Sequence, residues 1–193
     1  GRGLQTGIYF GRIFRELNQA AGEKGLERKI KELGLDERAT QSALDLLQRQ
    51  MESTDVLPDD RTILVEHFKD EKGNPQMMVH SVFGRQINAP LAILVQELAT
   101  RYTSVTMNYV EDDDGFLLFP YGECQIPFGL LQRIEPSQSK GILEAILPTT
   151  PLFNITFRYN IAHALMMGVK KAGRQPLWVQ RMRSAQMLDT ILP

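Results

Sequence analysis

The chain of 193 residues is 42% hydrophobic, which is enough for a buried core, and its 22 Lys and Arg nearly balance its 23 Asp and Glu. This balance excludes a protein that binds polyanions over its whole surface. The single cysteine, Cys124, excludes an internal disulfide, and no charged stretch followed by an apolar run opens the chain. We therefore expect a cytoplasmic protein without a membrane partner. Patterned sequence is cut at both ends, so we also expect one domain of a longer polypeptide.

Residues 1–57 predict a helical segment. Apolar side chains recur at helical spacing in three stretches, with Gly34 suited to end the second helix and Asp36 to cap the third. The three stripes are Phe10, Phe14 and Leu17; Leu26, Ile30 and Leu33; and Ala39, Ala43, Leu46, Leu47 and Met51.

Residues 58–122 predict a sheet unit. Two short β-rich runs flank the polar turn 70–74, and two more flank the acidic turn Glu111-Asp112-Asp113-Asp114-Gly115. Between these hairpins, Asn88 is suited to cap an amphipathic helix. The ββαββ order predicts an α+β fold with a mostly antiparallel sheet.

Residues 123–193 predict a second helical segment, packed on the sheet so that the whole chain forms one compact domain. We expect a short helix near 140–145 and a longer one that carries Phe153, Phe157, Ile161, Ala164 and Leu165. Pro176 suits the first turn of a last helix, which continues to the end of the chain.

Positive charge is concentrated in this last segment, because no carboxylate occurs between Glu144 and Asp189. A solvated surface normally mixes both signs, so this segment predicts a phosphate-binding face. Its basic residues are accompanied by the only tryptophan, Trp178, which either stacks on bases or packs in the core; packing is the favoured interpretation. The expected nucleic-acid-binding residues are Lys170, Lys171, Arg174, Trp178, Arg181 and Arg183, with Arg174, Arg181 and Arg183 first among them.

A second candidate is the run His80-Ser81-Val82-Phe83-Gly84-Arg85, which links a predicted strand to a helix. Loops in such positions often carry binding groups, so the run could contact a substrate or a neighbouring domain. The alternative, favoured by the periodicity, is that Gly84 supplies a turn while His80 and Phe83 pack inside.

The sequence contains no phosphate-loop motif, no Gly-x-Gly-x-x-Gly and no His-Glu-x-x-His, so we expect no catalytic site and no cofactor in this chain. Its histidines are scattered and Cys124 has no partner at ligand spacing, so we expect no metal. We interpret Glu111 to Asp114 as a solvated hairpin turn rather than a cation site.

Several blocks resemble the large helicase-related (Lhr) family. The run 80–85 with Asn88-Ala89-Pro90 is similar to its His-Ser-Pro-Phe-Gly signature, although Val82 stands where the family usually has Pro. Residues 173–185, Gly-Arg-Gln-Pro-Leu-Trp-Val-Gln-Arg-Met-Arg-Ser-Ala, resemble its Gly-Arg-x-x-Pro-Leu-Trp-x-Gln-Arg-x-Arg-x-Ala block. Three further blocks are similar to the family in order and spacing: residues 57–66, Asp113-Asp114-Gly115 and Phe157-Arg158.

The resemblance implies a DEAD/H-associated domain of a superfamily 2 ATP-dependent DNA helicase. In such enzymes RecA-like motor domains bind ATP and Mg²⁺ and step 3′ to 5′ along single-stranded DNA, and DNA repair is the usual pathway. This chain would contribute part of the strand channel, with single-stranded DNA and the RecA-like and winged-helix domains as partners. Alternatively, it is a scaffold that docks on those domains with little DNA contact, and His80, Ser81, Phe83, Gly84, Arg85 and Arg158 are the interface or loop candidates.

Overall fold

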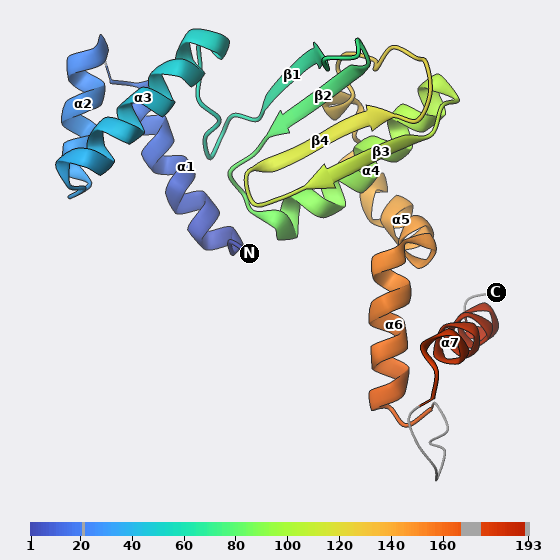
Figure 1. Cartoon of the computed structure of the whole chain (residues 1–193). Coiled ribbons are helices and arrows are strands. Elements are labelled where there is room, and N and C mark those ends of the chain that lie inside the picture. The colour runs from blue at the N-terminus through green and yellow to red at the C-terminus, as the bar shows by residue number, and fades with distance from the viewer. Residues whose placement is uncertain (21, 167–174, 192–193) are drawn as a thin grey trace. The chain divides into compact units, whose positions relative to one another are not determined.

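The computed structural model describes residues 1–20, 22–166 and 175–191, and the chain divides into two compact units, 1–134 and 135–193. Within the described ranges it contains seven α-helices and one four-stranded antiparallel sheet (Figure 1). The predicted α+β class is therefore confirmed. The segment boundaries at residues 57 and 122 and the packing of the last helices on the sheet stay predictions.

The first unit opens with three helices, as the apolar stripes predict: α1 (Leu4–Asn18), α2 (Gly22–Glu32) and α3 (Glu37–Thr54). The Asp36 side chain accepts a hydrogen bond of 2.7 Å from the Ala39 N–H, which confirms the predicted cap. The helices enclose a cluster of buried aliphatic side chains: Leu17, Leu26, Ile30, Leu44, Leu47 and Leu57. These helices are thus held by a small core of their own.

The side chain of Asn18 binds the backbone at the point where the chain leaves this helical cluster. Its amide nitrogen donates to the Leu57 carbonyl at 2.9 Å, and its amide oxygen accepts from the Leu57 N–H at 2.9 Å. Leu57 is only 2% exposed, so water cannot replace either bond. One side chain therefore satisfies both backbone groups of a buried residue.

The sheet consists of β1 (Leu64–Lys69), β2 (Pro75–His80), β3 (Met107–Glu111) and β4 (Gly115–Pro120) in the order β1-β2-β4-β3. Both predicted hairpins are present, because β1 pairs with β2 and β3 with β4. The side chain of Asp70 forms the first turn by accepting from the Lys72 and Asn74 N–H groups. Strands β1 and β3 are the outer strands of the sheet.

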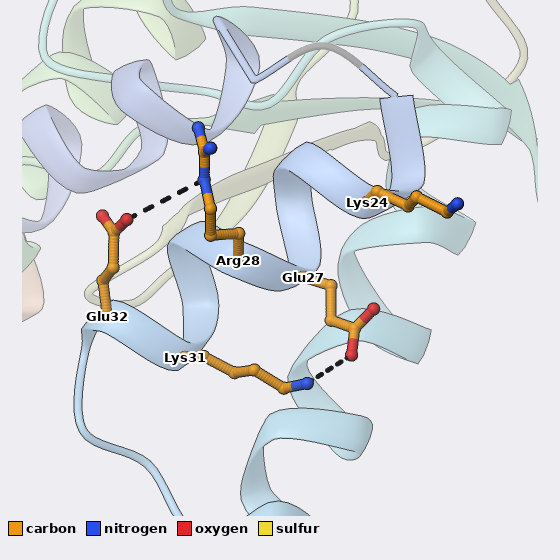
Figure 2. Close-up of a pocket in the computed structure, with 5 residues that line it drawn as sticks. All are labelled: Lys24, Glu27, Arg28, Lys31 and Glu32. Carbon is orange, nitrogen blue, oxygen red and sulfur yellow. Dashed lines mark hydrogen bonds and ion pairs between the residues drawn. The ribbon is translucent and has the colours of Figure 1, made fainter.

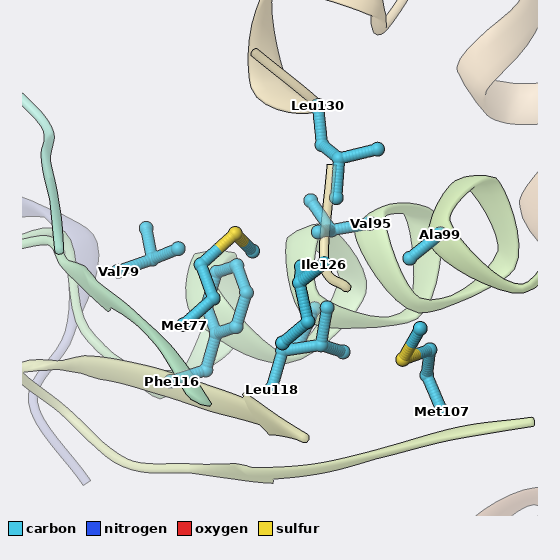
Figure 3. Close-up of a cluster of buried hydrophobic side chains, with 10 residues drawn as sticks. Met77, Val79, Val95, Ala99, Met107, Phe116, Leu118, Ile126 and Leu130 are labelled. Atoms are coloured by element: carbon cyan, nitrogen blue, oxygen red, sulfur yellow. The ribbon is translucent and has the colours of Figure 1, made fainter. Parts of the chain in front are cut away.

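Helix α4 (Arg85–Thr103) covers one face of the sheet and encloses the main core with it (Figure 3). A short 3₁₀ helix, η1 (Leu131–Arg133), follows the segment that completes this core. Small side chains on α4 allow close packing against larger ones from the strands. The buried cluster comprises Met77, Val79, Ala92, Val95, Ala99, Met107, Phe116, Leu118, Ile126 and Leu130.

The predicted cap of α4 is wrong. The helix begins at Arg85, three residues before Asn88, with Gly84 in the N-cap position at φ 87°. Asn88 is instead fully buried inside the helix, and its amide nitrogen donates to the carbonyls of Ser81 and Asp112. The positive φ of Gly84 turns the chain early, which moves Asn88 from the helix end to a position beneath the neighbouring loops.

Helix α1 approaches its neighbours through two glycines one turn apart. A Cβ atom at Gly7 would lie 2.4 Å from the Val82 carbonyl oxygen, and one at Gly11 would lie 2.5 Å from the Asp60 nitrogen. Both neighbouring groups are backbone and cannot rotate away. Arg15, one turn further, forms two hydrogen bonds of 2.7 Å with the Asp60 carboxylate. The backbone of α1 therefore lies directly on the segments that flank β1 and β2.

The second unit contains α5 (Pro136–Ile146), the 3₁₀ turn η2 (Leu147–Thr149), α6 (Pro151–His163) and α7 (Leu177–Ile191). The expected helices are present, although α6 ends before Ala164 and Leu165, with Leu165 at φ 56°. Helices α6 and α7 pack together (Figure 1), and the buried residues of the described part are Ile161, Ser184 and Leu188. The described part of this unit therefore has little core of its own.

Replacing Gly7 or Gly11 with alanine is expected to lower the free energy of unfolding of the first unit by about 1–3 kcal/mol, because the added methyl group collides with backbone. Urea denaturation followed by circular dichroism measures this. Gly3→Ala is the matched control, since a Cβ there meets nothing within 4 Å. Equal stability of all three variants would contradict the close packing of α1.

Asn18→Ala should also lower the free energy of unfolding by about 1–3 kcal/mol, because both Leu57 backbone groups lose their partner while buried. The same denaturation experiment applies, with Gln41→Ala as control. The Gln41 amide bonds Asp45 at the surface, so its loss should change the free energy by less than about 0.5 kcal/mol. A matching, small effect of both substitutions would show that the Asn18 bonds do not stabilise the cluster.

Candidate nucleic-acid interface

The loop that follows β2 is held by hydrogen bonds within its own unit. The Ser81 N–H donates to the Asp114 carbonyl at 2.9 Å, and the Ser81 carbonyl accepts from the Asn88 amide at 3.2 Å. Ser81 and Val82 are buried, and Phe83 is half-buried. This part of the His-Ser-x-Phe-Gly run therefore forms an internal joint between β2, α4 and the β3–β4 turn.

The N-terminal residues cover the end of the same loop. A Cβ atom at Gly84 would lie 2.4 Å from the Arg2 carbonyl oxygen. The Arg2 guanidinium contacts the Val82 carbonyl at 3.4 Å and forms an ion pair of 2.8 Å with Asp114. The glycine at this position thus permits the start of the chain to lie across the loop.

The acidic β3–β4 turn is held by arginines and is not simply solvated. Besides the pair of Arg2 with Asp114, Arg85 forms an ion pair of 2.8 Å with Glu111. The Arg85 N–H donates to Asp113 at 3.1 Å, and this bond is the main reason that the pKa of Asp113 lies below its ordinary value. The turn and the loop 80–85 therefore form one structure.

His80 lies on the sheet beside Glu66, and its Nε2 atom pairs with a Glu66 carboxylate oxygen across β1 and β2. Both side chains are half-buried. The His80 ring therefore has a partner, as the structural interpretation of this residue requires. Together these contacts join Ser81, Gly84 and Arg85 to the acidic turn and the N-terminal residues in one assembly, in which the Arg85 side chain stays exposed.

Two polar atoms in this assembly are buried without a hydrogen-bond partner among the described residues, Ser81 Oγ and Asn88 Oδ1. The sequence offered a signal for Asn88, which follows the glycine turn by four residues. Sequence reasoning assigned it to the helix cap instead of the interior.

Trp178 lies in the first turn of α7 and is 67% exposed, so its interpretation as a core residue is wrong. Arg181, three positions later, lies on the same side of the helix and is also exposed. Arg183 is exposed too, but two further positions place it on nearly the opposite side from Arg181. The helix therefore presents a Trp178–Arg181 pair and a separate Arg183.

The remaining basic candidates differ in position. Lys170, Lys171 and Arg174 lie outside the described residues. Arg158 is half-buried on α6, with its guanidinium carbon 5.7 Å from the centre of the Tyr159 ring. Arg158 therefore has a structural contact within its own helix.

A shallow pocket of about 480 Å³ on α2 is lined only by charged side chains, Lys24, Glu27, Arg28, Lys31 and Glu32 (Figure 2). Lys31 pairs with Glu27 at 2.5 Å and Arg28 with Glu32 at 3.9 Å. The pair of Lys31 with Glu27 raises the pKa of Lys31 and lowers that of Glu27. Because two of its three cations, Arg28 and Lys31, already have carboxylate partners, this surface is less suited to phosphate than α7.

Among the described residues, no group of three His, Cys, Asp or Glu side chains could hold a metal ion. Over the same residues, no helix has the length and apolar character needed to cross a membrane.

Comparison with known proteins identifies the family. The DEAD/H-associated family matches residues 57–192. The chain is 32% identical over 98% of its length to the Lhr helicase/probable uracil glycosylase of Mycolicibacterium smegmatis, and 29% identical over 75% to the Lhr helicase/uracil glycosylase of Escherichia coli. It covers 13% and 10% of those proteins.

The structure of Mycobacterium smegmatis helicase Lhr bound to ssDNA and AMP-PNP matches 98% of this chain with a TM-score of 0.81 and 30% identity. The chain covers 24% of that protein. Fold, sequence and motif order agree, and the chain belongs to the DEAD/H-associated family as an Lhr-type domain.

Proposed function

We propose that this chain is an accessory nucleic-acid-binding domain of a superfamily 2 ATP-dependent DNA helicase, and that it forms part of the channel for the single strand. The observation that carries the proposal is the exposed Trp178 with Arg181 one turn away. Both lie in the stretch between Glu144 and Asp189, which contains no carboxylate.

The chemistry of this pair suits a strand that must move. An exposed indole can stack on any base, and an arginine can contact any phosphate, so neither depends on sequence. A translocating helicase needs contacts to the strand that do not depend on its sequence. In this proposal ATP and Mg²⁺ bind to motor domains elsewhere in the polypeptide, and Lys170, Lys171 and Arg174 add further phosphate contacts.

The relatives support the proposal. The matching structure is of a helicase bound to ssDNA, and several relatives carry the name helicase. Because the chain covers at most 24% of the proteins compared, the activity of the complete protein is part of the proposal.

A second candidate function is an intramolecular scaffold that docks on the motor and winged-helix domains. The second unit favours it by exposing large apolar side chains: Ile155, Tyr159, Leu165, Met166, Leu177, Trp178 and Met182. A surface of this kind often marks a protein contact. The two functions differ in what Trp178 and Arg181 touch.

Arg181→Ala is expected to weaken single-stranded DNA binding by about tenfold and to flatten its salt dependence by about one counterion, because one phosphate contact is lost. Fluorescence anisotropy of a labelled oligothymidine over a salt series measures both. Because Trp178 is the only tryptophan, quenching of intrinsic fluorescence by the oligonucleotide reports its stacking directly.

Arg183→Ala is the matched control, since it removes the same charge from another side of α7. The channel proposal requires a larger loss for Arg181→Ala than for Arg183→Ala. Equal losses would indicate unspecific attraction, and an oligonucleotide that neither binds nor quenches Trp178 at low salt would favour the scaffold.

A further inference from the structure

A second opening lies in the first unit, between β1 and the segment before η1. It measures about 350 Å³, at the lower end of the range for small-ligand pockets. Its floor belongs to the main core, because Met77 and Leu130 are each 1% exposed (Figure 3). Since β1 is an outer strand, no further strand of the described residues closes this side.

Two rings form one wall of this opening. The His67 and Phe128 rings lie 4.2 Å apart between centres and are tilted by 39°. Phe128 is 74% exposed, whereas Leu130 two residues later is buried. Gly129, at φ 71°, makes the reversal that directs one side chain outward and the other into the core.

The polar groups around the rings suit a flat heterocycle. His67 is partly buried, and this burial lowers its pKa, so the imidazole is neutral at physiological pH and offers both a donor and an acceptor. The Gln132 side chain lines the same opening and supplies an amide. Planar apolar surface bordered by neutral donors and acceptors is the chemistry that recognises a nucleobase.

We propose that the opening beside the His67–Phe128 ring pair binds one nucleobase, which stacks on the side of the Phe128 ring that His67 does not cover, while Gln132 contacts its edge. This inference adds a base-binding subsite in the first unit and rests on the proposed function where the base belongs to a single strand. The base could equally come from a single strand or from a free nucleotide, so the experiment includes both.

The experiment follows the ring signals of Phe128 and His67 by NMR in the whole chain. The ligands are deoxyadenosine monophosphate, oligodeoxyadenosine and deoxyribose 5-phosphate, which lacks a base. We expect both ring signals to shift with the base-containing ligands and not with deoxyribose phosphate. Phe128→Ala should weaken the response at His67 by about five- to tenfold.

Tyr121→Ala is the matched control, because Tyr121 is 79% exposed and lies outside the opening. Since Phe128 is mostly exposed, its removal should leave the thermal unfolding of the chain unchanged. The proposal is overturned if neither ring responds to any base, or if Phe128→Ala and Tyr121→Ala weaken binding equally.

The ligands also separate this inference from the proposed function. Oligonucleotide binding that depends on Arg181 but leaves Phe128 unchanged overturns the subsite and keeps the channel. A Phe128 response to the mononucleotide, without any oligonucleotide binding, keeps the subsite and contradicts the channel. A peptide that protects the β1 amides from exchange while bases have no effect would mean that the opening binds protein.

Discussion

The close approach of α1 to the loop after β2 is the contact on which the first unit depends. Gly7 rests on the Val82 carbonyl, Gly11 on the Asp60 backbone, and Gly84 lies beneath the Arg2 carbonyl. Glycine is required at each position because any Cβ atom would overlap backbone. The helical cluster and the sheet would otherwise be two small cores joined by a linker.

This contact also determines the electrostatics of the unit. It places Arg2 against Asp114, while α4 begins where Arg85 can reach Glu111 and the turn at Asp113. Two carboxylates of the acidic turn, Glu111 and Asp114, are consequently paired with arginines of their own unit. The cationic stretch without carboxylates belongs to the second unit, so structural and proposed nucleic-acid-binding arginines occur in different parts of the chain.

Local patterns predicted the elements well, because helical stripes, the Asp36 cap and the two hairpin turns depend on neighbouring residues. Features that depend on contacts between residues distant in the sequence were harder to predict. The start of α4 was misplaced because Gly84, at φ 87° beside the distant Arg2 backbone, begins the helix three residues before Asn88. The two glycines of α1 were missed because their role depends on contacts with Val82 and Asp60, which are distant in the sequence.

The sequence indicates part of the proposed site, which stays a prediction. The segregation of charge indicates the segment that contains Trp178 and Arg181. Burial of the indole was favoured because aromatic side chains more often pack in a core than stack on bases. Its exposure accompanies the small core of the described part of the second unit, which composition does not reveal. The arginines were grouped by sequence proximity, whereas helical geometry separates Arg181 from Arg183.

The most direct test of this account is hydrogen exchange of the whole chain with and without a single-stranded oligonucleotide at low salt. The account predicts slower exchange in the first turns of α7, around Trp178 and Arg181, and unchanged exchange in residues 81–84, which form an internal joint. Protection of residues 81–84 without any change in α7 would contradict it, because the loop would then be the nucleic-acid surface.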